Sequence, residues 1–280
     1  MKISGFTIVR NGVKLQYPVI QSIKSILPVC DEFIVNVGES EDATLEMIKG
    51  IHSPKIKIIQ TKWDMSKGPT VLAEQTNIAL EHCSGDWAVY LQTDEVVHEA
   101  DLPKMKHCME LCLHKPQVDA LQFGWFHFYG SHWRYRIDAG WYQKQVRIIR
   151  NNGEIESVGD AYTFGRKDGG DLRVFRTGCY IYHYGWVFSE DIMAKRRLNQ
   201  GEIWSESRDA EKNTGRYEFG DLNRFPVYFG SHPAVMTGLV SSHPISQKDW
   251  KDISRRNWWN PFKWLRIRCK TGLRVRKKII

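Results

Sequence analysis

The first 95 residues alternate between apolar, strand-like runs and amphipathic, helix-like segments, and this alternation limits the folds open to the chain. Strands separated by helices at this spacing are typical of right-handed βαβ crossovers, which build a mostly parallel sheet with helices on its faces. We therefore predict an α/β fold of the Rossmann type. Strands are predicted over residues 6–9, 33–37, 55–60 and 87–94, and helices over 17–27, from Asp42 onward, and over 70–83.

The rest of the chain is predicted to extend the same domain and to end in two further segments. Strands are predicted over 120–128, 145–150 and 180–187, helices over 102–113 and 192–205, and a short helix near 234–240. An aromatic, arginine-containing stretch at 129–142 separates two of these strands. We divide the chain into a core (1–205), a loop-rich extension (206–254) and a basic, aromatic tail (255–280).

Composition indicates a folded protein of the cytoplasm. No segment approaches the 18 or more apolar residues of a membrane span, and the start of the chain lacks the pattern of a secretory signal. The six cysteines form no Cys-x-x-Cys pair, so reduced thiols are expected.

The excess positive charge is confined to the tail. Ten of the lysines and arginines fall within 255–280, which contains no acid, so that the net charge of +8 becomes −2 for residues 1–254. This distribution argues against a nucleic-acid-binding face. Tryptophans interleaved with basic residues, as at Trp258 and Trp259, favour contact with an anionic membrane surface. The alternative is that these aromatic rings pack back onto the domain.

The predicted strand that starts at Trp87 ends on two adjacent acids, Asp94 and Glu95. A buried parallel strand delivers such residues to the carboxyl edge of its sheet, where α/β folds bind their ligands. Carboxylates there suit a hard divalent cation, which can bind a diphosphate. The alternative is that the acids end the strand and face water.

The loop that follows the second strand, residues 38–44, leaves the sheet at the same edge and could line a nucleotide pocket. Asp42 within it could also cap the next helix. The chain has neither a Gly-x-Gly-x-x-Gly nor a Gly-x-x-x-x-Gly-Lys-Ser/Thr motif, which disfavours a dinucleotide-dependent dehydrogenase and a P-loop phosphotransferase.

Taken together, these motifs resemble a family-2 glycosyltransferase with a GT-A fold. The resemblance rests on Gly-Glu-Ser-Glu-Asp-Ala-Thr at 38–44, Gln-Thr-Asn at 75–77, Gly-Asp-Trp at 85–87 and Gln-Thr-Asp-Glu at 92–95. In the second half, Val-Arg-Ile-Ile-Arg at 146–150, the 157–161 segment and Tyr-His-Tyr-Gly-Trp at 182–186 are similar to lipopolysaccharide-core and capsule-type members. The similarity covers roughly residues 3–205.

This resemblance implies an enzyme that takes a sugar from a nucleotide-sugar donor, aided by Mn²⁺ or Mg²⁺, and passes it to a saccharide or lipid-linked acceptor. It assigns a donor half to about 1–98 and an acceptor half to about 99–205. Asp94, Glu95 and His183 are the implied metal ligands; for His183, a satisfied core histidine is the alternative. The implied nucleotide-sugar contacts are Thr7, Val9, Val37, Glu39, Asn77, Gln92, Thr93 and Asp94.

Two positions depart from the family pattern. Gln92 stands where the first acid of an Asp-x-Asp motif would be, and it offers a neutral oxygen without charge. Val37 and Gly38 stand where acids often contact the nucleotide, so base recognition could fall to Asn36 or Glu39.

An inverting transfer needs a general base to deprotonate the acceptor hydroxyl. The resemblance places this acid between the 146–150 strand and His183, which points to Asp160. The competing acids are Glu154, Glu156, Asp138, Glu190 and Asp191.

Three other functions remain open from the sequence. A catalytically silent relative that binds sugars or nucleotides is suggested by Gln92 and by the missing acids at Val37 and Gly38. A nucleic-acid-binding protein would work through the basic tail. A nucleotidyltransferase would share the sheet and the carboxylates, but we expect it to carry a glycine-rich basic first loop, which Arg-Asn-Gly at 10–12 hardly provides.

Overall fold

The computed structural model describes residues 1–203, 217–244 and 246. Met1–His243 forms one compact unit. The predicted tail at 255–280, with its alternating tryptophans and basic residues, lies outside the described residues.

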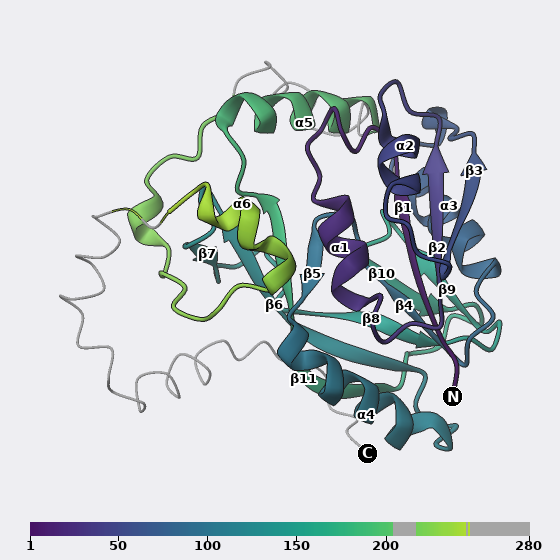
Figure 1. Ribbon diagram of the computed structural model, residues 1–280. Helices are drawn as coiled ribbons and strands as arrows, with labels where there is room; N and C mark the ends of the chain where they lie inside the picture. Colours follow the sequence, from purple (N-terminus) through teal and green to yellow (C-terminus); the bar gives the residue numbers. More distant parts are fainter. Residues whose placement is uncertain (204–216, 245, 247–280) are drawn as a thin grey trace, which may run out of the picture. The chain divides into compact units, whose positions relative to one another are not determined.

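The first half of the unit follows the predicted alternation of strands and helices (Figure 1). Its elements are β1 (Ile3–Val9), α1 (Val19–Ile26), β2 (Glu32–Gly38), α2 (Thr44–Lys49), β3 (Ile56–Thr61), the 3₁₀ turn η1 (Met65–Lys67), α3 (Thr70–Glu81) and β4 (Trp87–Tyr90). Asp42, which was predicted as a possible cap of the next helix, accepts the backbone N–H of Thr44 at 3.0 Å, while the N-cap position itself is taken by Ala43.

The second half is richer in short strands than predicted. Its elements are β5 (Glu95–Val97), η2 (Glu99–Asp101), α4 (Leu102–Leu113), β6 (Ala120–Tyr129), β7 (Tyr135–Arg136), β8 (Lys144–Arg150), β9 (Ile155–Val158), β10 (Thr163–Arg166), β11 (Val174–Trp186), α5 (Glu190–Ile203), η4 (Leu222–Arg224), η5 (Ala234–Met236) and α6 (Thr237–Ser241). The strands β5, β7, β9 and β10 had not been predicted, because two to four residues are too few to show a periodicity.

One large sheet organises the unit, in the order β3-β2-β1-β4-β8-β6-β11-β5, with β7 beside β6. Strands β3, β2, β1 and β4 pair in parallel, and so do β6 and β11. Strand β8 runs antiparallel to both β4 and β6, and β5 antiparallel to β11. The predicted α/β class with a mostly parallel sheet is therefore confirmed, and an antiparallel strand joins its two parallel blocks.

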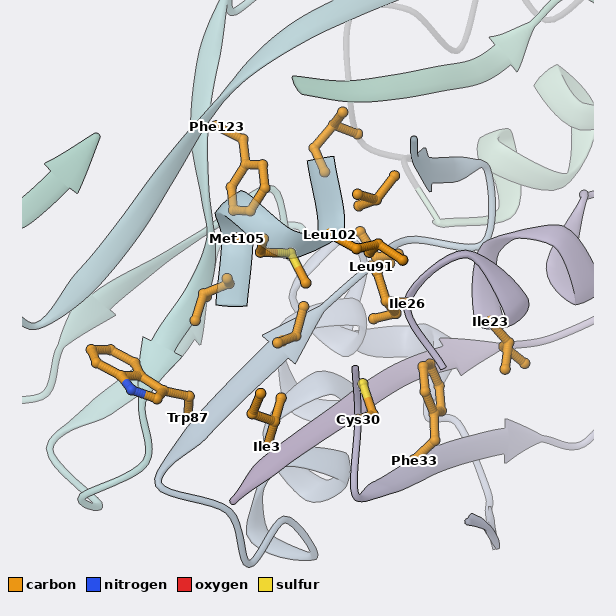
Figure 2. Packing of buried hydrophobic residues seen from close by; sticks show 14 of the residues in the cluster. Ile3, Ile23, Ile26, Cys30, Phe33, Trp87, Leu91, Leu102, Met105 and Phe123 are labelled. Atoms are coloured by element: carbon orange, nitrogen blue, oxygen red, sulfur yellow. The ribbon is translucent and has the colours of Figure 1, made fainter. Parts of the chain in front are cut away.

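Alternate side chains of the strands point to opposite faces of the sheet, and each face carries its own core. Trp87 and Val89 pack with α1 and α4 on one face, where Ile23, Ile26 and Met105 are fully buried (Figure 2). Ala88 and Tyr90 pack on the other face with α3 and with Phe164 of β10. Because both faces are covered, the central strands read as continuous apolar runs. The five described cysteines are free and buried, as expected of packing residues.

Candidate functional site

The carboxyl ends of β1, β4 and β11 border a cleft of about 440 Å³, which the β9–β10 loop and α5 complete. Six of the predicted site residues line it, namely Val9, Gln92, Thr93, Asp94, Asp160 and His183. Its other charged or aromatic lining residues are Arg10, Tyr17, Trp63, Tyr90, His127, Trp141, Tyr142, Tyr162, Trp186, Arg196, Arg197 and Tyr217. The cleft thus combines acids, cations and flat rings at the edge of the sheet where α/β proteins bind ligands.

Asp94 lies in the turn between β4 and β5, directly beside β11. Its carbonyl accepts the backbone N–H of Tyr184 at 2.8 Å, which fixes the turn against that strand. The carboxylate Oδ2 lies 3.5 Å from Nε2 of His183, and the Asp94 side chain is 16% exposed. Gly185 leaves the space between them open, since a Cβ there would come within 2.7 Å of both atoms.

A chain of hydrogen bonds sets the orientation of His183. His127 Nε2 lies 2.7 Å from the carbonyl oxygen of Tyr142, and because a carbonyl only accepts, this nitrogen carries the proton. Burial, followed by the neighbouring His183 ring, lowers the pKa of His127 to about 3, so the ring is neutral and its Nδ1 accepts. His183 therefore donates from Nδ1 over 3.0 Å and turns Nε2 toward Asp94.

The charge of Asp94 is stabilised inside the cleft. Burial by itself would raise the pKa of this carboxyl, but His183 and the guanidinium of Arg196 hold the pKa below its usual range. The carboxylate is therefore ionised at neutral pH and is available to bind a cation.

Arg196 of α5 connects segments that border the cleft through hydrogen bonds to backbone carbonyls. It is 3% exposed and donates to the carbonyls of Leu15 at 2.8 Å, Gly185 at 2.7 Å and Gln16 at 3.0 Å. Its guanidinium also stacks on Tyr17, 4.2 Å from the ring centroid. Runs of basic residues such as that at 195–197 most often form a solvated helix face. The structure instead buries the central arginine of this run and joins α5 to the loop between β1 and α1 and to the end of β11.

Glu95 has a different partner from the predicted cation. Its two carboxylate oxygens accept from Arg147 Nε and Nη2 at 2.7 Å each, and both side chains are 0% exposed. A third hydrogen bond reaches Glu95 from the backbone N–H of Gln92 at 3.0 Å. Because its oxygens are used in this buried pair and it does not line the cleft, the structure corrects its assignment as a metal ligand.

Asp160 lines the cleft from the loop between β9 and β10. No residue in the described part of the chain donates a hydrogen bond to its carboxylate, although the residue is partly buried. None of the competing acids lines the cleft. Asp138 is paired with Arg136, Glu154 faces solvent near Arg166, and Glu190 accepts the backbone N–H of Phe219.

Four predicted nucleotide contacts lie outside the cleft lining. Thr7 is fully buried and donates to the Leu91 carbonyl at 2.7 Å, and Val37 belongs to the apolar core. Glu39 is exposed, and Asn77 binds the backbone of Ser157 through both side-chain atoms, at 2.7 and 3.1 Å. For these four residues the structure shows supporting or solvent-facing positions, so direct nucleotide contact is not supported.

The end of β2 shows which residues could replace the missing acids. The amide of Asn36 is used internally, since it donates to Gln75 and accepts from Thr61. The indole of Trp63 covers Gly38 and lines the cleft, and its buried Nε1–H has no partner among the described residues. Trp63 was missed because its position in the cleft depends on the loop after β3, which carries no motif.

The Asp94–His183 pair fits a divalent cation. Two ligands at right angles around octahedral Mg²⁺ lie about 3 Å apart, close to the 3.5 Å observed between Oδ2 and Nε2. The described residues contain no group of three or more His, Cys, Asp or Glu that could hold a metal ion by themselves. A cation at this pair would therefore need further oxygens from a phosphate group or water, as is usual for Mg²⁺.

Fold and cleft define an α/β protein with a polar and aromatic site at the carboxyl edge of its sheet. No family model matches the chain, and no curated protein matches it. Solved structures do resemble it. S. aureus TarS 1–349 in complex with UDP-GlcNAc is 16% identical, with a TM-score of 0.45 over 76% of this chain and 69% of that one.

Two further solved structures are similar. The chain spans 41% of the length of S. aureus TarS, at 16% identity, 76% coverage of this chain and a TM-score of 0.44. Glucosyl-3-phosphoglycerate synthase from Mycobacterium tuberculosis, in complex with Mn²⁺, UDP and phosphoglyceric acid, is 17% identical with a TM-score of 0.33, over 44% of this chain and 43% of that one. Within the described residues, no helix is long and apolar enough to span a membrane.

Proposed function

We propose that the protein is a glycosyltransferase that uses a nucleotide-sugar donor and a divalent cation. One observation carries the proposal: the Asp94–His183 pair, which can bind a cation, and Asp160, whose carboxylate has no hydrogen-bond partner among the described residues, line the same cleft at the carboxyl edge of the sheet. The first can hold a diphosphate through a metal ion, and the second can accept a proton. An inverting transfer of a sugar from a nucleoside diphosphate can use both functions, neutralisation of the leaving diphosphate and removal of the acceptor proton.

On the donor side, Asp94 and His183 would hold Mn²⁺ or Mg²⁺, which neutralises the charge that develops on a leaving diphosphate. Arg10 and Arg197 add positive charge to the same cleft. Arg196 contributes through its effect on Asp94 and through the three carbonyls that it holds in place. None of these groups selects a particular nucleotide base.

On the acceptor side, Asp160 accepts the proton of the attacking hydroxyl. The acceptor oxygen forms its bond to the anomeric carbon while the bond from that carbon to the diphosphate oxygen breaks, and its electron pair leaves with the nucleoside diphosphate. Attack from the side opposite the leaving group inverts the anomeric centre. We place the acceptor against Trp141, Trp186 and Tyr217, because sugar rings present apolar faces to aromatic side chains.

The finer assignment is that of a family-2 enzyme of cell-surface polysaccharide or lipopolysaccharide synthesis, acting on a saccharide or lipid-linked acceptor. It is supported by the motif order at 38–44, 75–77, 92–95 and 182–186. Contact of the basic tail with an anionic membrane, at the inner face of the cell membrane, would bring the enzyme to a lipid-linked acceptor. Co-sedimentation with anionic vesicles, lost when 255–280 is deleted, tests that part.

The donor site is tested by a thermal-shift screen of UDP-, GDP-, ADP- and CMP-linked sugars, with and without Mn²⁺. A ligand that binds only the folded protein stabilises it by about 2.7 kcal/mol at a hundredfold excess over its dissociation constant. We expect one nucleotide class to raise the melting temperature in a Mn²⁺-dependent way in the wild type but not in Asp94→Ala.

The matched control is Asp86→Ala, which removes a carboxylate that lies outside the cleft lining and is half exposed. It should keep the ligand-dependent shift. The absence of a shift with every donor, or a shift that survives Asp94→Ala, would overturn the proposed donor site. Binding without turnover would instead favour a silent sugar- or nucleotide-binding relative.

A further inference from the structure

Gln92, in the turn that carries Asp94, and Arg147, in β8, both donate hydrogen bonds to the loop that carries Asp160. We infer that these two side chains are positioning residues for Asp160, and that Gln92 takes this role at a position where the resembled family has an acid. The inference rests on the proposed function, since it concerns the geometry of the proposed base. It gives the Gln-Thr-Asp-Glu turn two tasks, cation binding by Asp94 and placement of the base by its neighbours.

The backbone of the loop at 159–162 is strained, so contacts from outside the loop are needed to maintain its conformation. Gly159 and Ala161, on either side of Asp160, have φ angles of +65° and +62°. Glycine adopts this region freely, but an alanine rarely does, and such a residue persists only where the surroundings determine its conformation. Ala161 is 1% exposed, so its environment can impose that conformation.

Two hydrogen bonds to consecutive carbonyls supply these contacts. Gln92 Nε2 donates to the carbonyl of Ala161 at 3.2 Å, and Arg147 Nη1 donates to the carbonyl of Tyr162 at 2.9 Å. A carbonyl cannot donate, so the amide of Gln92 must present its nitrogen here. A carboxylate at position 92 could not make this bond unless it were protonated.

Both donors are themselves fixed by Glu95. Its carboxylate accepts two hydrogen bonds of 2.7 Å from Arg147 and a third, of 3.0 Å, from the backbone N–H of Gln92. The carbonyl of Gln92 also accepts from Ser22 of α1 at 3.0 Å. Asp94 and Asp160 are therefore held by one connected set of contacts, so a shift of the turn displaces the cation site and the proposed base together.

The experiment compares Gln92→Met with Gln92→Glu in the full-length protein. Both replacements remove the donor to Ala161, and only the second restores an acid to the motif. Three quantities are measured: hydrogen exchange of the 159–162 amides without ligand, Mn²⁺ affinity without nucleotide, and turnover with UDP-, GDP-, ADP- and CMP-linked sugars.

We expect exchange in 159–162 to accelerate about five- to tenfold in both variants, as one hydrogen bond is lost. Turnover should fall about 10- to 100-fold in kcat, because small displacements of a catalytic group have effects of this size. The KM for the donor should stay within about twofold, and Mn²⁺ should bind Gln92→Met as it binds the wild type. A general loss of stability would not separate kcat from KM in this way.

The opposite results overturn the inference. If Gln92 served the cation, Gln92→Glu would gain turnover and Gln92→Met would lose Mn²⁺ affinity, with exchange in the loop unchanged. Ala161→Gly provides an independent arm, since it relieves the strained φ while both carbonyls remain. We expect it to raise exchange in the loop without lowering the melting temperature, and unchanged exchange would contradict the role of the strain.

Gln143→Met is the matched control, because the Gln143 amide likewise donates to a backbone carbonyl, that of Trp141, at 3.2 Å. It should leave exchange at 159–162 unchanged. Failure of the proposed function is recognised separately. Wild type without turnover on any of the four donor classes would refute the glycosyltransferase proposal, whereas the exchange measurements need no substrate and still test the hold on the loop.

Discussion

The two halves of the sheet bury different chemistry. Between residues 1 and 90, all of which the structure describes, Glu32 is the only charged side chain that is fully buried. Beyond residue 90, the described chain buries Glu95, Asp119, Arg134, Arg147 and Arg196, together with the rings of His127, His132 and His183. The parallel half is a scaffold of apolar strands, and the mixed half carries buried charges.

This difference follows from how the charges are satisfied. Glu32 accepts from Ser4, Ser84 and Lys57, the last of which is 60% exposed, at the edge of the scaffold away from the cleft. Glu95 and Arg147, 52 residues apart, are both inaccessible to solvent. A buried ion pair is costly to assemble and does not by itself argue for stability. Because Glu95 adjoins Asp94 and Arg147 donates to the Tyr162 carbonyl in the Asp160 loop, we assign the pair a role in the geometry of the site.

The largest expected effect is on chemistry in the mixed half. Asp160→Asn should lower kcat by about 10²- to 10⁴-fold, the usual contribution of a general base, while Mn²⁺-dependent nucleotide binding stays unchanged. Turnover and binding are measured on the same preparation. Glu156→Gln, an acid of the adjacent strand outside the cleft lining, is the control. An equal loss of kcat in Asp160→Asn and Glu156→Gln would show that Asp160 is not the general base.

The next effect is on stability and compares the halves directly. Arg147→Met should lower the free energy of unfolding by about 3–5 kcal/mol, because Glu95 is left buried and unpaired. Lys57→Met removes the exposed partner of Glu32 and should cost about 1 kcal/mol or less. Denaturant unfolding measures both. The double variant Glu95→Gln with Arg147→Met should recover part of the lost free energy of unfolding. If Arg147→Met and Lys57→Met lowered this free energy by similar amounts, the proposed difference between the two halves of the sheet would be wrong.

A smaller effect concerns the space between Asp94 and His183. Gly185→Ala would place a Cβ 2.7 Å from both coordinating atoms and should weaken Mn²⁺ binding about tenfold, the equivalent of 1.4 kcal/mol. Gly238→Ala in α6, where nothing lies within 4 Å of the added carbon, should leave binding unchanged. Isothermal titration distinguishes the two. Undiminished binding in Gly185→Ala would place the cation elsewhere.

The smallest effect is the pH dependence of the scaffold. Burial alone would raise the pKa of Glu32, but hydrogen bonds from Lys57, Ser4 and Ser84 lower it to about 2. A depressed folded-state pKa stabilises the protein above the unfolded value of about 4.5, and this contribution is lost as the pH falls toward 2. Glu32→Gln should therefore flatten the fall in melting temperature between about pH 4.5 and 2. If the melting temperature of Glu32→Gln fell with pH as it does in the wild type, the proposed contribution of Glu32 would be wrong.

The same contrast explains what could be predicted from the sequence. In the scaffold, burial on both faces produces apolar runs at regular spacing, so the strands could be predicted from local pattern, although β4 ends at Tyr90 and not at Asp94 as predicted. In the mixed half, function depends on pairs that are distant along the chain. Glu95 was predicted as a metal ligand because its adjacency to Asp94 is visible in the sequence, while its contact with Arg147 depends on the register of β8 against β4.

His127 and Arg150 show the same limit. His127 stands in an apolar strand between two phenylalanines, a signal for a buried polar contact, but its partner His183 is 56 residues away. Arg150 donates to backbone carbonyls at and beyond the end of α4, including those of Leu113 and Val118. Periodicity locates such side chains on a strand and leaves their partners undetermined.

The most direct test of the account is a crystal of the protein grown with Mn²⁺ and the nucleoside diphosphate selected by the thermal-shift screen, with the cation located by anomalous scattering. The account predicts one peak bonded to both Asp94 Oδ2 and His183 Nε2, with the diphosphate completing its coordination and Asp160 facing the open side of the cleft. A nucleotide bound in the cleft with the cation away from this pair, or a nucleotide bound elsewhere on the protein, would contradict it.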